Sequence, residues 1–135
     1  MAKEYFGWNG KKVENGRRLL QWLGTDKIRT INYDFWVIAV ANLIEVFEDE
    51  FDYFFIPDCR FPNEVTYLCE KFGSEKVMLV KMHRKDFVSM LTKEQQNHPS
   101  EISMDNYPAD YTIDVGEGLD KVEREVNKFL STYNM

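Results

Sequence analysis

Cysteine and histidine are scarce in this sequence, and their scarcity excludes two classes of small protein. The two cysteines, Cys59 and Cys69, are too few for a disulfide scaffold in a chain of 135 residues. With only His83 and His98 beside them, no zinc-site spacing occurs, and we predict no metal held by the chain itself. No apolar run approaches the roughly 20 residues of a membrane span. Residues 1–4 (MAKE) also lack the apolar stretch of a signal peptide, so we expect a cytoplasmic protein with no membrane partner.

Positive charge is also in short supply. The chain has 17 lysines and arginines against 23 aspartates and glutamates, a net charge of −6. Such a balance opposes non-specific binding to nucleic acid, so we expect no nucleic-acid partner, although a small basic pocket remains compatible with it. Aromatic residues, in contrast, are plentiful, with 10 Phe, 7 Tyr and 3 Trp. They exclude a disordered chain, and the length predicts a single domain over residues 1–135.

The order of apolar segments predicts helices alternating with strands. Helices are expected over 17–23, 35–48, 62–72 and 119–130, and strands over 52–58, 76–82 and 111–115. Gly24 is expected to stop the first helix, and Asp34 to cap the second. The helix over 35–48 is apolar almost all round, which predicts that it is buried. Residues 85–109 are expected to form a polar, lid-like segment with one short helix near 87–91. This order is typical of a three-layer α/β fold, a mostly parallel sheet flanked by helices.

Ligands of such sheets bind beyond the carboxyl ends of the strands. That rule directs attention to residues 57–64, 83–85 and 115–118. In the first segment, Asp58 can hold a magnesium-bound water or orient a substrate hydroxyl, and Arg60 offers a two-pronged donor for phosphate. Asn63 and Glu64 fall in the first turn of the next helix, whose exposed N–H groups favour an anion. A purely structural alternative is that Asp58 pairs with Arg60 and Glu64 only complements the helix dipole.

The other candidate segments have similar alternatives. Arg84, in the basic run 83–85, can meet a phosphate or belong to a solvated charged surface. The segment 98–101 places His98 near Ser100 and Glu101, which suggests either a catalytic cluster or an ordinary surface loop. Arg17 and Arg18 precede an apolar stripe and can equally be the solvated end of a packed helix. Cys59 has no evident activating base and is not a predicted nucleophile.

Five motifs together resemble the deoxynucleoside monophosphate kinase family of phages and bacteria. They are RRLLQWLGTD at 17–26, DFWV at 34–37, IPDCRFPNE at 56–64, Arg84, and HPSE at 98–101. They occur in the family's order and spacing, and the resemblance covers about residues 4 to 131. It implies the P-loop nucleoside-monophosphate-kinase fold, with transfer of the γ-phosphoryl group of ATP to a deoxynucleoside monophosphate in the presence of Mg²⁺.

The resemblance also implies roles for individual residues. Arg17 and Arg18 would lie on the monophosphate side, and Trp36 would line or support the nucleotide pocket. Arg84 and the segment 98–101 would belong to a lid over the phosphates. The implied catalytic residues are Asp58, Arg60 and Arg84, and the implied substrate-binding residues are Arg17, Arg18, Asp26, Trp36, Asn63, Glu64, His98 and Glu101.

The sequence departs from the family pattern at two places. It contains no Gly-x-x-x-x-Gly-Lys motif, so we expect the cradle for the ATP phosphates, and the strand before it, to be missing from this chain. After the last strand, the family's Asn-Asp-Gly turn is replaced by VGEG at 115–118, which changes the loop near the adenine of ATP.

Loss of a central strand would leave unpaired backbone groups on its two neighbours. The remaining strands can close up, a second copy can donate an element to form a homodimer, or a missing N-terminal half can be supplied separately. The expected partner is a deoxynucleoside monophosphate, and the expected function is mainly monophosphate binding. The alternative is a non-catalytic remnant that acts as a dimeric or split-protein interaction module.

Overall fold

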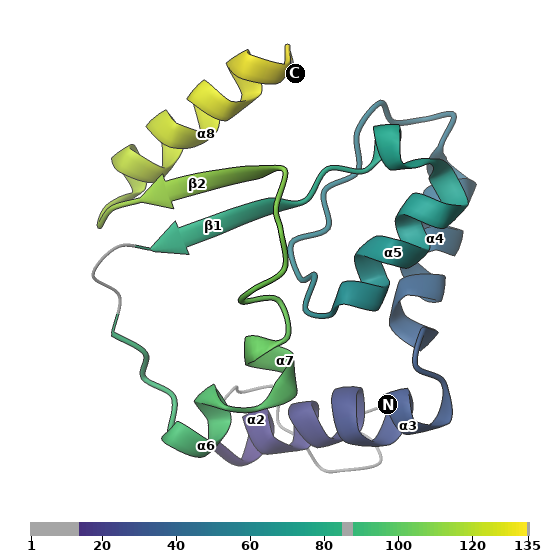
Figure 1. Ribbon diagram of the computed structural model, residues 1–135, viewed down its shortest axis with the longest axis vertical. Helices are drawn as coiled ribbons and strands as arrows, with labels where there is room; N and C mark the ends of the chain where they lie inside the picture. Colours follow the sequence, from purple (N-terminus) through teal and green to yellow (C-terminus); the bar gives the residue numbers. More distant parts are fainter. Residues whose placement is uncertain (1–13, 85–87, 135) are drawn as a thin grey trace. The chain divides into compact units, whose positions relative to one another are not determined.

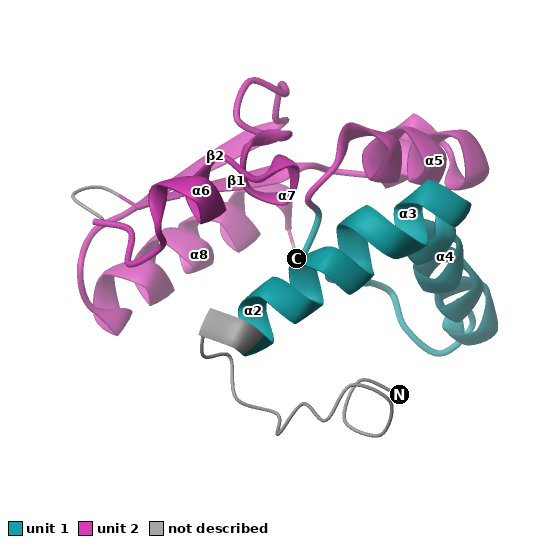
Figure 2. Ribbon diagram, turned by 90° about the horizontal axis from the view of Figure 1, so that it is seen from below, with its two compact units in different colours: residues 1–59 teal, residues 60–135 magenta. Residues whose placement is uncertain are grey.

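In the residues that the structure describes, helices accompany a small parallel sheet (Figure 1). The structure is a computed structural model that describes residues 14–84 and 88–134, with side chains from Gly16 onward. Two compact units are present, residues 1–59 (unit 1) and residues 60–135 (unit 2), coloured separately in Figure 2. Each is considered by itself below, and the expectation that the 135 residues form one domain stays a prediction.

Unit 1 begins with a long helical run. It consists of α2 (Glu14–Gln21), the π-helical η1 (Trp22–Lys27) and α3 (Ile28–Ile31). The prediction that Gly24 stops the first helix is wrong, because this glycine keeps a negative φ and the helix continues through it as a wider turn. A glycine ends a helix when it adopts the left-handed conformation. Here the run instead ends at Asn32, whose backbone is extended.

Helix α4 (Phe35–Phe47) lies where the sequence predicts it. Asp34 occupies its N-cap position but makes no side-chain capping bond. The Asp34 N–H instead donates to Asn32 Oδ1 at 3.0 Å, which tightens the turn before the helix. The expectation that the whole helix is buried is wrong, since only Val37 and Ala41 are buried within it. The chain thus leaves most of an apolar helix accessible to solvent.

The predicted strand over 52–58 does not form. These residues follow an irregular path that ends in a turn, and every one of them is exposed. A strand exists only where a neighbouring strand satisfies its backbone groups. Within residues 14–84 and 88–134, the one ladder joins β1 (Val80–Arg84) to β2 (Tyr111–Val115). The apolar run at 52–58 is therefore a strand-like sequence without a strand partner.

In unit 2, helix α5 (Pro62–Phe72) has the bounds that its sequence predicts. Pro62 opens it, and Gly73 ends it with a φ of 98°. The single turn η2 (Ser74–Lys76) then delays the strand predicted at 76–82, so that β1 begins only at Val80. Residues 88–91, the described part of the short helix predicted near 87–91, are not helical. Two four-residue helices follow instead, α6 (Lys93–Gln96) and α7 (Pro99–Ile102).

The sheet of unit 2 pairs β1 with β2 in parallel, and Arg84 lies opposite Val115 at the carboxyl ends. Helix α8 (Leu119–Tyr133) packs on one face of it. The buried centre of this packing is Ile113, Val115 and Phe129, bordered by Val80, Tyr111, Val122, Val126 and Leu130. Because side chains alternate along a strand, the opposite face carries polar residues, including His83 and Asp114, 2.9 Å apart. The parallel pairing and the helix on the sheet confirm the α/β class.

No single helix in the described part of the chain is long and apolar enough to cross a membrane. Two successive helical stretches, Gly16–Ile31 and Phe35–Phe47, are together long and apolar enough for a span, but the chain bends by 87° between them. They pass this test by length and composition only.

Candidate functional site

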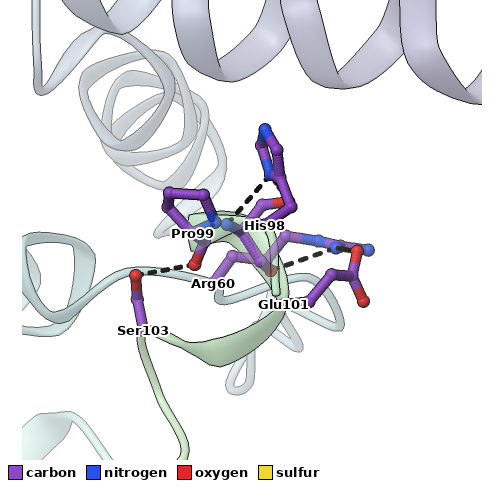
Figure 3. A network of polar contacts seen from close by, with 6 residues as sticks. Arg60, His98, Pro99, Glu101 and Ser103 are labelled. Atoms are coloured by element: carbon purple, nitrogen blue, oxygen red, sulfur yellow. Dashed lines mark hydrogen bonds and ion pairs between the residues drawn. The ribbon is translucent and has the colours of Figure 1, made fainter. Parts of the chain in front are cut away.

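Two of the predicted site motifs meet within unit 2, although their residues lie 41 positions apart (Figure 3). Arg60 Nη1 donates to Glu101 Oε1 at 2.7 Å and to the carbonyl oxygen of Ser100 at 3.2 Å. The first contact is an ion pair between side chains that are 41% and 24% exposed. Hydrogen bonds between ionised partners are short and orient a guanidinium strongly. Arg60 is therefore held in one direction while part of its side chain stays accessible.

Glu64 fixes the backbone from which Arg60 projects. Its Oε2 atom accepts the N–H of Arg60 at 2.7 Å and the N–H of Phe61 at 3.1 Å. Phe61 is the N-cap residue of α5, and its side chain has no hydrogen-bonding atom. The carboxylate three residues later therefore supplies the half of a capping box that reaches back from the first turn and accepts the N–H of the N-cap residue.

His98 organises the turn that carries Glu101. Its Nδ1 lies 2.8 Å from Ser100 Oγ and accepts the Ser100 N–H at 3.3 Å. Ser103 Oγ donates to the carbonyl oxygen of Pro99 at 2.6 Å, closing the same short helix, α7. Ser100, the third member of the cluster suggested at 98–101, is buried, although it is not among the site residues that the resemblance implies. Because Glu101 turns to Arg60 while His98 contacts Ser100, the structure brings these residues together as a support for Arg60, without a triad arrangement.

The charge of this network limits what it can bind unaided. Glu64 and Glu101 contribute two carboxylates, and Arg60 contributes one guanidinium. A phosphate monoester carries close to two negative charges at neutral pH. An anion at this place thus needs further cations besides Arg60.

Arg84 lies at the carboxyl end of β1, beside the loop that follows β2. It lines an open hollow of about 470 Å³ together with Met82, Val115, Gly116, Gly118, Leu119 and Val122. None of the residues around Arg60 lines this hollow. The two predicted strand-end segments 83–85 and 115–118 therefore adjoin at their described residues, as expected for parallel strands.

Four of the predicted site residues, Arg17, Arg18, Asp26 and Trp36, lie on helices of unit 1. Arg17 is partly buried and Arg18 exposed on α2, and Asp26 is exposed within η1. The Trp36 indole N–H donates to the carbonyl oxygen of Gly24 at 2.8 Å, which ties α4 to the π-helical turn. This bond gives Trp36 a structural role within unit 1, and its implied place at the nucleotide pocket stays a prediction.

Asp58 is exposed in the turn that ends unit 1, and Asn63 is partly buried in the first turn of α5. Cys59 and Cys69 are free thiols, both partly buried. No group of three or more His, Cys, Asp or Glu that could hold a metal ion occurs among residues 14–84 and 88–134. Among the predicted residues of unit 2, Glu64 and Glu101 form hydrogen bonds with Arg60.

Comparison with known proteins gives one match. A family model described as deoxynucleotide monophosphate kinase matches residues 6–126, a range that includes all five motifs. Neither the curated proteins nor the solved structures include a significant match to the chain.

Proposed function

Since the chain belongs to the deoxynucleotide monophosphate kinase family, we propose that it binds a deoxynucleoside monophosphate through Arg60. The observation that carries this proposal is the Arg60–Glu101 contact of 2.7 Å. It joins two motifs of the family that are distant in sequence, and it directs a partly exposed guanidinium.

Arg60 is the residue proposed to touch the phosphate. A guanidinium presents paired N–H groups in a plane, which matches two phosphate oxygens better than a lysine ammonium does. Glu101 and the Ser100 carbonyl hold the Nη1 side of the group, and Glu64 holds its backbone. Glu101 and Glu64 are therefore positioning residues, and their effect on the ligand passes through Arg60.

Additional cations must complete the charge balance. We assign this role to Arg17 and Arg18, following the family resemblance, and place Arg84 near the phosphates in the lid. Trp36, Asp26, Asn63 and His98 are proposed to line or support the nucleotide pocket. Asp58 is proposed to orient a hydroxyl or a magnesium-bound water.

The family reaction also needs ATP and Mg²⁺, and the residues of this chain do not fit that part of the site. A Gly-x-x-x-x-Gly-Lys loop cradles phosphates with backbone N–H groups and a lysine, and the sequence contains no such loop. We therefore derive no transfer step, and the proposed function is recognition of the monophosphate substrate.

Calorimetry tests the proposal with dTMP, dGMP and dCMP as ligands. We expect saturable binding of at least one of them. Arg60→Met should weaken that binding by about tenfold or more, because a charge-assisted pair is lost. Arg124→Met, which removes an exposed arginine of α8, serves as the matched control and should bind like the unmodified chain. Absence of heat with all three nucleotides at millimolar concentration, or equal binding by both variants, would count against the proposal.

The alternative, a non-catalytic dimer or half of a split protein, predicts a different result. It requires a stable assembly in solution and no response to nucleotide. Sedimentation analysis with and without dTMP distinguishes the two functions, since monophosphate binding requires no second copy.

The finer expectations about fold and setting accompany this proposal. We propose the three-layer arrangement of the P-loop kinases, in which both faces of the parallel sheet are covered. We also propose a cytoplasmic location, where deoxynucleotide substrates are made.

A further inference from the structure

A concentrated apolar surface in unit 1 has no part in the proposed nucleotide site. It is formed by the second half of α4 and the irregular segment after it, and is called here the 43–56 surface. Its members are Leu43, Val46, Phe47, Phe51, Tyr53, Phe54, Phe55 and Ile56, all of them exposed. Val46 is 70% exposed and Phe55 is 73% exposed. Single exposed apolar residues are ordinary, but eight of them within residues 43–56 indicate an interaction site.

The aromatic rings of this surface contact one another. The ring centres of Phe47 and Phe51 are 6.2 Å apart, and those of Phe51 and Phe54 are 6.1 Å apart in an edge-on arrangement. Such ring pairs stabilise each other, and each ring has few rotatable bonds. Binding therefore loses little side-chain entropy, as is typical of aromatic anchors in interfaces.

Negative charges lie among these apolar residues in the sequence. Four exposed carboxylates, those of Glu48, Asp49, Glu50 and Asp52, alternate with them in sequence. Residues 30–59 include seven acidic residues and no lysine or arginine, whereas the rest of the chain has 17 basic and 16 acidic residues. The net charge of −6 thus originates in the stretch that carries the 43–56 surface.

We propose that the 43–56 surface docks a segment of another protein that presents apolar side chains flanked by lysines or arginines. The apolar contacts would supply most of the affinity, and the carboxylates would select the charge of the partner and speed its association. The inference concerns unit 1 alone and does not depend on nucleotide binding at Arg60.

Charge argues against other occupants. A second copy of the chain would bring an identical acidic rim against this one, and like charges across an interface cost several kcal/mol. Anionic lipid headgroups and nucleic acid would be repelled for the same reason. A basic apolar segment is the partner whose charge and hydrophobicity both match.

Two synthetic helical peptides test the proposal on the full chain. Both have the same leucine positions, and the polar positions are all lysine in one peptide and all glutamate in the other. Fluorescence anisotropy of the labelled peptides measures binding. We expect the lysine peptide to bind at least about tenfold more tightly than the glutamate peptide at low salt, since charge pairing favours only the former.

Two pairs of matched variants separate specific docking from general attraction to an acidic protein. Val46→Ser with Phe55→Ser should weaken binding of the lysine peptide by about tenfold or more, because it removes two exposed apolar contacts. Met90→Ser with Leu119→Ser, at residues that are 95% and 85% exposed in unit 2, should leave binding unchanged.

The charge pair keeps every apolar residue in place. The triple variant Glu48→Gln, Asp49→Asn, Glu50→Gln should weaken binding several-fold. The control triple Glu70→Gln, Glu94→Gln, Glu123→Gln removes as much charge from exposed positions of unit 2 and should have little effect. Circular dichroism confirms that each variant is folded.

Three outcomes would overturn the proposal. The first is equal affinity for the two peptides. The second is equal weakening by the test and control variants, which indicates general charge attraction. The third is occupation of the surface by something else. It would be shown by a dimer at low salt that Val46→Ser with Phe55→Ser dissociates, or by uncharged phosphatidylcholine vesicles binding in preference to the lysine peptide.

Discussion

Glu64 illustrates how one carboxylate can have a structural and a functional meaning at the same time. Its Oε2 atom accepts the N–H groups of Arg60 and Phe61, so it caps the start of helix α5 and holds the backbone of Arg60, the residue proposed to contact the phosphate. Glu64→Ala should therefore lower the free energy of unfolding by about 1–2 kcal/mol, because two donors lose their acceptor. Urea denaturation measures the change.

Glu70→Ala is the control for this prediction. Glu70 is exposed on the same helix, so its loss should change the free energy of unfolding by less than about 0.5 kcal/mol. Equal effects of the two substitutions would show that the Glu64 contacts contribute no net stability.

Glu101 allows a sharper test of positioning. Glu101→Ala removes the acceptor that orients Arg60, and we expect deoxynucleoside monophosphate affinity to fall by about tenfold. Glu101→Gln keeps an acceptor oxygen and removes a negative charge that opposes phosphate, so its affinity should stay within about threefold of the unmodified chain. Calorimetry measures the deoxynucleoside monophosphate affinity of both variants. If glutamine fails as completely as alanine, the charge of Glu101 matters in some other way.

At the scale of elements, Gly73 and Gly24 should respond in opposite ways to substitution by alanine. Gly73 ends α5 with a φ of 98°, and a Cβ there would meet the carboxylate of Glu75. Gly24 lies inside a helix, and a Cβ there would meet nothing within 4 Å. Gly73→Ala should therefore destabilise the chain by about 1–2 kcal/mol, whereas Gly24→Ala should stabilise it by up to about 1 kcal/mol. Thermal unfolding measures both, and the same sign for the two changes would contradict the assignment of Gly24 to a helix.

The sequence predicts well the elements whose signals are local. Pro62 and Gly73 define helix α5, and the run at 111–115 predicts β2 with its correct bounds. Prediction fails where the outcome depends on distant partners. The run at 52–58 has strand-forming residues but no strand beside it, and the helix over 35–48 is apolar yet mostly exposed. Burial and pairing are properties of neighbours, which periodicity along one segment does not contain.

The same limit applies to the candidate site: its residues can be selected from the sequence, but the contacts between distant ones cannot. The resemblance selects Arg60, Glu64, His98 and Glu101 one by one. In the structure Glu64 accepts the backbone N–H of Arg60, Glu101 accepts its guanidinium, and His98 contacts Ser100 in the turn that carries Glu101. The resemblance does not indicate that Glu101 is the partner of Arg60, because that contact joins residues 41 positions apart. The part played by Ser100 also depends on the fold, since its carbonyl oxygen and its N–H both act through the backbone.

At the scale of the whole molecule, charge is unevenly distributed. The acidic rim of the 43–56 surface should keep copies of the chain apart, and salt should weaken this repulsion. We therefore expect a monomer at low salt and increasing self-association at high salt. The triple variant Glu48→Gln, Asp49→Asn, Glu50→Gln should associate already at low salt. Sedimentation velocity measures both effects.

The triple variant Glu70→Gln, Glu94→Gln, Glu123→Gln is again the control. It removes the same number of negative charges from the chain, at positions outside the 43–56 surface. If this control self-associates as readily as the triple variant Glu48→Gln, Asp49→Asn, Glu50→Gln, the total charge of the chain, and not the position of the charges, governs self-association.

The separate anchoring of Arg60 has a consequence for how this family can diversify. Glu64 holds the backbone of residue 60 whatever side chain projects from it, while Glu101 contacts only the guanidinium. Under the proposed function, substitution at position 60 would therefore change ligand recognition while the Glu64 contact to the backbone stays in place. Mutational tolerance at a recognition residue lets new substrate preferences arise by single steps, and position 60 is where we expect selection experiments to find them.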